Sequence, residues 1–303
     1  MVSEIIFSVI IPTYNREAFL LDAVRSAVNA SPEHTEIIVV NDGTNLSERT
    51  KSVLGTSNVS IVKTDGGVGA GGARNHGANH ATGQWLLFLD DDDLIAAGYW
   101  KSLANFLLYE IESKNQSYGF CYATTSNDRE EMNVISKRKV KNASFFLEGR
   151  NLLQPKLAAL SRGFWVSSLI FKEVGGIDVR LRVNEDTDLC LKLIASGANC
   201  YFSSFNGAIV YKGPRDRKIS QSVTKTHSAA ERASYFKRII DKNTELLKTD
   251  SAANKWIWKR YLKMAARAKD LTVIANLTTN ETFALKEKLL LAAYWFGIFL
   301  LRL

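Results

Sequence analysis

Ile5-Ile-Phe-Ser-Val-Ile-Ile-Pro-Thr-Tyr-Asn15 begins as a β-branched apolar run and ends in polar residues. Three similar runs follow, at Glu36 to Val40, Val59 to Lys63 and Trp85 to Leu89. Between the first two runs, from Glu17 to Asn29, apolar residues recur at helical spacing. Short apolar strands that alternate with helices predict a parallel sheet with crossover helices.

Each of the four runs is followed by residues that can hydrogen-bond or carry charge. These ends are Thr13-Tyr-Asn15, Asn41-Asp-Gly43, Lys63-Thr-Asp65 and Asp90 to Asp93. Open α/β sheets bind their ligands at the carboxyl ends of the strands. We therefore expect the functional site at this edge of the sheet.

The run Phe88-Leu-Asp-Asp-Asp-Asp93 places four carboxylates directly after a buried-looking strand. Carboxylates this close repel one another unless a cation neutralises them. The alternative is a solvated acidic turn that caps the next helix, which is common for one or two Asp residues and less so for four. The run therefore predicts a divalent cation, and oxygen ligands favour Mn²⁺ or Mg²⁺ over zinc.

Five blocks in order carry a resemblance to a known family. They are Val9-Ile-Ile-Pro-Thr-Tyr-Asn15, Glu36-Ile-Ile-Val-Val-Asn-Asp-Gly43, Gly72-Ala-Arg-Asn-His-Gly77 with Ala81-Thr-Gly83, Leu89 to Asp93, and Gly175-Gly-Ile-Asp178 with Asn184-Glu-Asp-Thr-Asp-Leu189. Together they resemble the family-2 glycosyltransferases of bacterial surface-polysaccharide type. The resemblance implies a GT-A fold, an α/β architecture with a nucleotide-binding mixed sheet flanked by helices.

The resemblance also implies residues that bind the nucleoside diphosphate sugar. Pro12, Tyr14 and Asp42 match residues that line the base pocket, where the ring stacks and the carboxylate accepts the uracil imide N–H. Each has a structural alternative, a packed aromatic for Tyr14 and a turn with Gly43 for Asp42. Arg74 matches an arginine that would meet the diphosphate, and its alternative is an ordinary surface arginine.

The acidic motifs receive their roles in the same way. Asp90 matches the acid that contacts the ribose and metal region, Asp92 the acid that ligates the metal, and Asp91 the variable position between them, beside the nucleotide sugar. Because all four positions are Asp, a slip of one residue stays open. Asp186 matches the general base, with Asp188 as the fallback, and its alternative is a helix cap.

Two other functions compete with sugar transfer. Gly67-Val-Gly-Ala-Gly-Gly72 satisfies the dinucleotide fingerprint GxGxxG and would make the chain a dehydrogenase, although such fingerprints normally follow the first strand. A noncatalytic sugar-nucleotide or glycan-binding protein would keep the same fold. A retained Asp186 beside a full acidic run speaks against that second alternative.

Charge divides the 303 residues unevenly. Residues 1–100 hold 6 basic and 12 acidic residues, a net charge of −6, whereas residues 212–303 hold 19 and 8, a net charge of +11. The three cysteines form no CxxC pair and favour a reducing compartment, and Glu4 stands where a signal peptide would have a basic start. A cytoplasmic protein is expected.

The basic C-terminal segment predicts three helices. Ser228 to Glu231 is a capping-box pattern that opens one helix to about Leu247, Ser251 can cap a second to about Lys269, and a third covers about Glu281 to Leu303. Four bases recur every four residues on the second helix, at Lys255, Lys259, Lys263 and Arg267. A basic amphipathic helix followed by a short apolar run predicts peripheral attachment to an anionic membrane at its inner face. Packing against the catalytic domain or a second subunit is the alternative.

These observations predict a GT-A catalytic domain at residues 1–212 and a basic helical extension at residues 213–303. Within the catalytic domain we expect a nucleotide-sugar half at about 1–95 and an acceptor half, with the base, at about 96–212. The acceptor site should lie on loops between Tyr122 and Trp165, where Trp165 either stacks on a sugar or belongs to the core.

The expected reaction is an inverting transfer of a sugar from a nucleoside diphosphate sugar, most simply a UDP-sugar. The acceptor would be a hydroxyl of a glycan or lipid-linked oligosaccharide in cell-surface polysaccharide or lipopolysaccharide synthesis. No nucleic-acid partner is expected, because aromatics of the tail sit with aliphatic residues rather than in a basic groove. The sequence leaves the donor sugar, the acceptor, the linkage and any homo-oligomer open.

Overall fold

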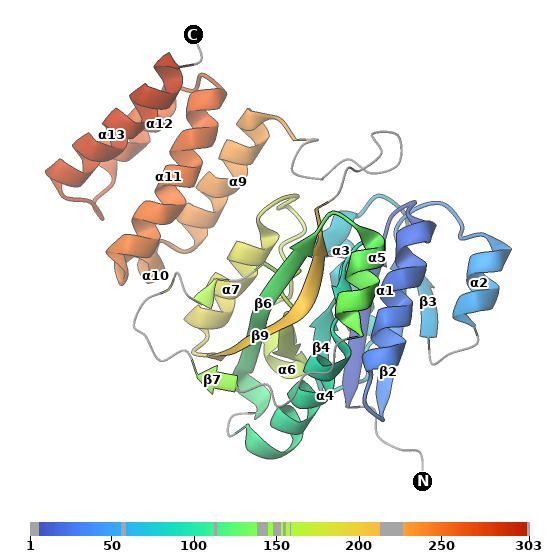
Figure 1. Ribbon diagram of the computed structural model, residues 1–303. Coiled ribbons are helices and arrows are strands. Elements are labelled where there is room, and N and C mark those ends of the chain that lie inside the picture. The colour runs from blue at the N-terminus through green and yellow to red at the C-terminus, as the bar shows by residue number, and fades with distance from the viewer. Residues whose placement is uncertain are drawn as a thin grey trace.

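The computed structural model describes residues 6–55, 59–111, 114–137, 145–147, 153, 156–157, 159–212 and 227–301. Within them, a mixed β-sheet lies between two layers of helices, and a group of C-terminal helices stands beside this α/β part (Figure 1). The fold class expected from the sequence is confirmed.

The sheet contains nine strands among the described residues, in the order β3-β2-β1-β4-β8-β6-β9-β5, with β7 paired to β9. The strands β1 to β4 are mutually parallel, whereas β8 is antiparallel to β4 and β6. Their bounds are β1 Phe7–Thr13, β2 Thr35–Asn41, β3 Val59–Lys63, β4 Trp85–Phe88, β5 Leu94–Ile95, β6 Ser117–Ser126, β7 Phe145–Leu147, β8 Trp165–Ser167 and β9 Asn199–Tyr211.

Helices cover both faces of this sheet. On β1, Val9 and Ile11 pack into one core with residues of α1 and α4, whereas Ile10 packs into the other with residues of α3, α6 and α7. A strand covered on both faces reads as a continuous apolar run, which is the pattern of β1 in the sequence. The helices are α1 Glu17–Ala30, α2 Glu48–Leu54, α3 Gly69–His80, α4 Ala97–Asn105, α5 Arg129–Ser136, α6 Ser168–Glu173 and α7 Glu185–Ala195, with a π-helix at Phe106–Glu110 and a 3₁₀ turn at Lys114–Gln116.

The first four predicted strands are confirmed to within about two residues, and so is the helix between the first two. The prediction missed α2. A short helix predicted after the glycine-rich turn, from Ala73 to Ala81, is α3, which starts four residues earlier because the glycines at its beginning carry no apolar signal. The suggestion that Trp165 stacks on a sugar is wrong. Its side chain lies in β8 and is fully buried against Trp85.

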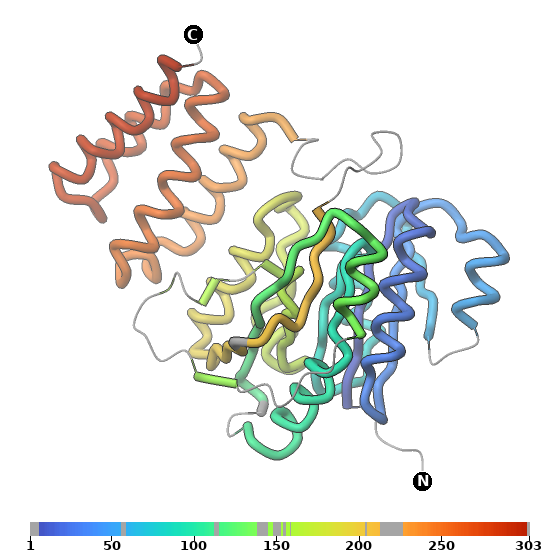
Figure 2. Tube along the Cα trace, viewed as in Figure 1, coloured from blue at the N-terminus to red at the C-terminus, as the bar shows by residue number. Residues whose placement is uncertain are grey.

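The C-terminal helices pack on one another around an apolar core that also contains Leu153, Leu181 and Leu191 of the α/β part, and Figure 2 shows α9 and α11 running side by side. They are α9 Ala229–Lys242, α10 Thr244–Lys248, α11 Ser251–Arg267, α12 Thr272–Thr279 and α13 Leu285–Leu300. The capping box of Ser228 and Glu231 is confirmed, whereas Asp250, not Ser251, caps α11. The predicted first helix breaks at Asn243, whose side chain donates to the Ile239 carbonyl.

The predicted basic face of α11 does not stand free along its whole length. Lys255 forms an ion pair with Glu287, and the Lys259 ammonium lies 5.9 Å from the centre of the Tyr294 ring, so both bases meet α13. The apolar residues of α13 also lie partly inside and partly outside. Leu291 and Trp295 are buried against the other helices. This contact lies within the C-terminal helices themselves. The alternative that the sequence left open, packing against the catalytic domain, is seen in the core that these helices share with Leu181 and Leu191. The opposite face of α13 exposes Leu285, Leu289, Leu290, Phe296 and Leu300.

Among the described residues, none of the helices has the length and apolarity needed to cross a bilayer.

Candidate active site

Polar residues from three neighbouring strands meet at one edge of the sheet. Thr13 ends β1, Asp42 follows β2, and the run Asp90 to Asp93 follows β4. Because β1 pairs in parallel with both β2 and β4, these ends lie on the same side. The gathering of polar groups predicted from the sequence is confirmed.

Three carboxylates of the acidic run converge. One oxygen each of Asp90, Asp92 and Asp93 lies within 4.8 Å of the others. Asp93 also accepts a hydrogen bond from the Tyr211 amide at 3.0 Å, and burial together with the charges of Asp90 and Asp92 raises its pKa. Hard oxygen ligands at this spacing suit Mg²⁺ or Mn²⁺, so the residues present fit a divalent cation.

Asp91 lies on the other side of the run. Its side chain is fully buried, and its Oδ2 accepts hydrogen bonds from Thr13 Oγ1 at 2.7 Å and Arg16 Nε at 3.1 Å. Burial raises the pKa of Asp91 to about 7 despite the charge of Arg16. We expected Asp91 to contact the nucleotide sugar, but in this structure the carboxylate has no exposed surface and anchors the acidic run to β1.

The sequence reading missed Arg16. It directly precedes α1, and its Nη1 donates to Asp92 Oδ2 at 2.9 Å while its Nε reaches Asp91. One guanidinium therefore holds both the buried Asp91 and Asp92, a member of the three-carboxylate cluster. The sequence signal that could have identified Arg16 is its place directly after the first predicted strand, in a chain that has four acids after the fourth.

Arg74 joins the acidic run to a distant helix. Its side chain is 6% exposed, its Nη2 donates to Asp90 Oδ1 at 2.5 Å, and its Nη1 donates to Glu185 Oε1 at 3.2 Å. The sequence predicts a contact between Arg74 and a diphosphate. In the structure both ends of the guanidinium bind carboxylates, so Arg74 is no ordinary surface arginine, and its contact with a diphosphate stays a prediction.

Glu185 and Asp186 are presented at the beginning of α7. Asn184 precedes them in the left-handed conformation, with φ of 60°, which asparagine tolerates better than most residues. Burial raises the pKa of Glu185 to about 7 against the charge of Arg74. Burial also raises the pKa of Asp186, opposed by the Thr187 amide, by Arg74 and by Arg260. A carboxylate with a raised pKa is a better proton acceptor near neutral pH.

Asp188, the fallback base, lies in a different environment. It is fully buried, and its two oxygens accept hydrogen bonds from the Lys242 ammonium at 2.9 and 2.8 Å. The Asn243 amide approaches the same carboxylate at 3.5 Å. Asp188 thus attaches the C-terminal helices to α7 and has no exposed surface toward an acceptor.

The expected base-pocket residues differ in exposure. Tyr14 is 56% exposed just beyond β1, whereas Pro12 is buried inside this strand. The Asp42 carboxylate accepts hydrogen bonds from Thr64 Oγ1 at 2.5 Å and from the amides of Val68 at 3.0 Å and Gly69 at 2.8 Å. The backbone amides of the glycine-rich turn therefore bind the Asp42 carboxylate. Gly69 adopts a positive φ in this turn, a conformation that glycine tolerates without strain.

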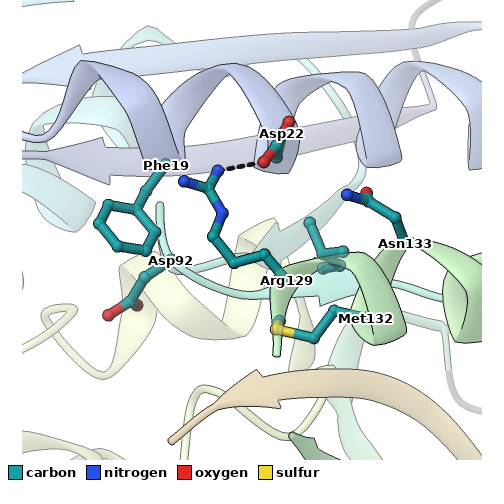
Figure 3. Close-up of a pocket in the computed structure, with 7 residues that line it drawn as sticks. Phe19, Asp22, Asp92, Arg129, Met132 and Asn133 are labelled. Atoms are coloured by element: carbon teal, nitrogen blue, oxygen red, sulfur yellow. Dashed lines mark hydrogen bonds and ion pairs between the residues drawn. The ribbon is translucent and has the colours of Figure 1, made fainter. Parts of the chain in front are cut away.

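Behind the acidic run, α1 and α5 enclose a pocket with Asp92 at one end (Figure 3). Arg129 of α5 closes its wall by pairing with Asp22 and lying 4.4 Å from the centre of the Phe19 ring. The cavity gives a water-sized sphere about 10 Å³ of room, about enough for one water molecule. This pocket is therefore too small for a nucleotide sugar.

The family model described as glycosyl transferase family 2 matches residues 8–174, more than half of the chain. The chain belongs to glycosyl transferase family 2. Membership confirms the resemblance read from the five sequence blocks. The dehydrogenase alternative is wrong, because the GxGxxG turn follows β3 and its amides serve Asp42.

Relatives of this family-2 glycosyltransferase differ in how much they share with it. An uncharacterized glycosyltransferase of Haemophilus influenzae is 24% identical over 96% of this chain and 89% of its own length. The minor teichoic acid biosynthesis protein GgaB of Bacillus subtilis is 36% identical, over 36% of this chain and 12% of its own. GalNAc(5)-diNAcBac-PP-undecaprenol beta-1,3-glucosyltransferase of Campylobacter jejuni is 31% identical, over 41% of this chain and 39% of its own.

Solved structures share the fold of this glycosyltransferase. The crystal structure of S. aureus TarS 1-349 superposes with a TM-score of 0.60 at 18% identity, over 97% of this chain and 78% of that one. The same protein in complex with UDP-GlcNAc gives a TM-score of 0.59 at 19% identity. The match extends over the C-terminal helices, and at this identity it shows the fold alone.

Proposed function

We propose that this glycosyltransferase transfers a sugar from a UDP-sugar to a glycan or lipid-linked hydroxyl, with inversion at the anomeric carbon. The observation that carries the proposal is the Arg74 guanidinium, which pairs at once with Asp90 of the acidic run and Glu185 of α7. This pairing places the carboxylates suited to a metal next to the carboxylates suited to a base. A transfer reaction needs both around one anomeric carbon.

In this proposal Asp186 is the general base. Its raised pKa allows it to take the proton of the acceptor hydroxyl as the oxygen attacks the sugar. Attack from the face opposite the leaving diphosphate inverts the anomeric centre. Asp188 is not proposed as a substitute base, because Lys242 already occupies both of its oxygens.

Asp90, Asp92 and Asp93 are the residues that would hold Mn²⁺ or Mg²⁺, and the cation would supply charge neutralisation for the departing diphosphate. For the base pocket, the exposed ring of Tyr14 supports stacking on uracil. Pro12 and Asp42 would line the same pocket, Pro12 from inside β1. The Asp42 carboxylate would accept the uracil imide N–H with acceptor capacity that the glycine-rich turn does not use.

The relatives support the choice of substrates. TarS has been crystallised with UDP-GlcNAc and with UDP, which favours a UDP-sugar donor here. GgaB is a teichoic acid biosynthesis protein, and the Campylobacter enzyme is named for an undecaprenol-linked acceptor. We infer an acceptor from the assembly of a cell-surface polysaccharide.

We also propose that the C-terminal helices rest on an anionic membrane surface. The exposed face of α13 presents leucines and Phe296 along four turns, which is the apolar face that an interfacial helix needs. The segment from 212 to 303 carries a net charge of +11, and each base near an anionic surface contributes about 1 kcal/mol. The membrane face is α13 in this proposal, flanked by bases of α11.

Turnover of nucleotide sugars with Mn²⁺ tests the reaction. A panel of UDP-, GDP- and dTDP-sugars is screened for release of the nucleoside diphosphate, with and without EDTA. We expect activity with a UDP-sugar, abolished by EDTA and by Asp92→Asn, because the leaving diphosphate loses its counter-charge. Full turnover in EDTA would contradict the metal assignment.

Vesicle sedimentation tests the membrane contact. The double change Leu289→Ser and Leu300→Ser removes exposed apolar surface and leaves the contact between the Phe296 and Trp295 rings intact. We expect it to reduce binding to vesicles rich in phosphatidylglycerol and to leave binding to neutral phosphatidylcholine vesicles low. Equal sedimentation of wild type and variant would exclude α13 as the membrane face.

A further inference from the structure

Two arginines at the active site are already committed to carboxylates. Arg16 bridges Asp91 and Asp92, and Arg74 bridges Asp90 and Glu185. The charge of each guanidinium is therefore already opposed by two carboxylates. The proposed reaction nevertheless brings at least two phosphates to this site.

Arg260 of α11 differs from both. It is exposed, and its guanidinium has no ion pair or hydrogen bond to any residue that the structure describes. Its carbon Cζ lies 4.4 Å from the centre of the Trp256 ring and 5.8 Å from that of Phe236. Stacking on aromatic rings fixes the plane of a guanidinium while its N–H groups stay available for planar anions.

The helices that carry Arg260 are fastened to the catalytic part next to the proposed base. Lys242 of α9 pairs with Asp188, which lies in the same turn of α7 as Asp186, and both Lys242 and Arg238 pair with Asp178. α9 and α11 pack along each other in one core. The charge of Arg260 is also felt at Asp186, where it opposes the effect of burial on the pKa of that carboxyl.

We propose that Arg260 is a phosphate-binding residue that the C-terminal helices contribute to the active site. The proposal rests on the proposed role of Asp186, because that carboxylate defines where the acceptor and the donor diphosphate meet. A guanidinium stacked on Trp256 can bind two phosphate oxygens at once. The phosphate belongs either to the donor diphosphate or to a phosphorylated acceptor, and binding experiments can separate the two.

The test compares Arg260→Gln with Arg260→Lys and with Lys259→Gln, an exposed base on the adjacent position that faces Tyr294 instead. Calorimetry with Mn²⁺ present measures UDP, with uridine as the phosphate-free control. Ligand-observed NMR on the UDP-saturated protein measures sn-glycerol 3-phosphate, with glycerol as its control. Melting temperatures establish that each variant is folded.

If the donor supplies the phosphate, Arg260→Gln weakens UDP about tenfold or more, as expected for loss of a charged hydrogen bond, and leaves uridine unchanged. If the acceptor supplies it, UDP binding is retained and binding of glycerol phosphate is lost. Arg260→Lys should restore part of either effect, and Lys259→Gln should show neither. Unchanged binding of both phosphates in Arg260→Gln overturns the proposal, as does an equal loss of UDP and uridine.

These binding measurements do not depend on turnover. Failure of the proposed function would appear as full sugar transfer by Asp186→Asn, whatever Arg260→Gln does. Intact dependence on Asp186 together with unchanged phosphate binding in Arg260→Gln would overturn the role of Arg260 alone.

Discussion

The first turn of α7 uses acidic residues in two ways. Glu185 pairs with Arg74, and both Glu185 and Asp186 keep part of their surface exposed, whereas Asp188 in the same turn is fully buried and paired with Lys242. The first pair faces the strand ends of the sheet, and the third acid faces the C-terminal helices. Three acids within four residues thus divide between chemistry and attachment.

The same contrast separates the α/β part from the C-terminal helices. Around the acidic run, Arg16 and Arg74 are each bound by two carboxylates, which fixes the geometry before any ligand arrives. In the C-terminal helices, bases lie over aromatic rings, as Arg260 does over Trp256 and Lys259 does near Tyr294. We infer that the ion pairs around the acidic run hold the active-site side chains in fixed positions, whereas the bases of the C-terminal helices are available to bind anions.

Asp186→Asn against Asp188→Asn is the sharpest test of the division within α7. We expect Asp186→Asn to lower kcat on the order of 10²-fold or more, with UDP affinity nearly unchanged, because only proton removal is lost. Asp188→Asn should retain most of kcat but destabilise the fold by about 2 kcal/mol, since Lys242 loses one of its two carboxylate partners and keeps Asp178. Steady-state kinetics and thermal unfolding separate the two effects. The reverse pattern would show that Asp188 is the base.

Trp295→Ala against Phe296→Ser tests whether α13 is a packing element and a surface at once. Trp295 is fully buried and Phe296 is 48% exposed. Truncating the buried indole should cost about 3–5 kcal/mol of unfolding free energy. Phe296→Ser should cost about 1 kcal/mol, because only the edge contact of its ring with Trp295 is lost. Chemical denaturation monitored by Trp fluorescence and circular dichroism measures both. Equal stability of the two variants would mean that α13 does not pack as described.

The strand ends could be predicted from the sequence because apolar runs and the polar residues after them are local signals. Pro12, Asp42 and the acidic run all fall where the sequence places them, at the edge shared by β1, β2 and β4. The register within Asp90 to Asp93 could not be predicted, because four identical side chains carry no cue for direction. Only the Thr13 hydroxyl and Arg16 show that Asp91 points inward.

The contacts that complete the site are long-range and left no pattern to read. Arg74 and Glu185 are 111 positions apart, and Asp188 and Lys242 are 54 apart. Helical spacing correctly placed Lys255 and Lys259 on one face of α11. It could not show that α13 would fold back onto that face, because which faces meet depends on tertiary packing.

The smallest effect that we predict concerns the pH dependence of stability, and it sharpens the contrast at the beginning of α7. Burial raises the pKa of Glu185 to about 7, well above the value of about 4.3 that an unfolded chain gives it. The folded state therefore holds the proton more tightly than the unfolded state. The stability from this preference is fully present below about pH 4 and is lost as the pH rises through 7.

Glu185→Gln removes this titration and retains a side chain that can accept a hydrogen bond from Arg74. Between pH 5 and pH 8, the melting temperature of the wild type should therefore fall by a few degrees more than that of Glu185→Gln, at about 2 °C per kcal/mol. Other titrating groups contribute to both proteins and cancel in the difference. Differential scanning fluorimetry across this range, without divalent cations, measures it. A wild type that gains stability relative to Glu185→Gln as the pH rises would show that Arg74 outweighs burial and holds Glu185 ionised.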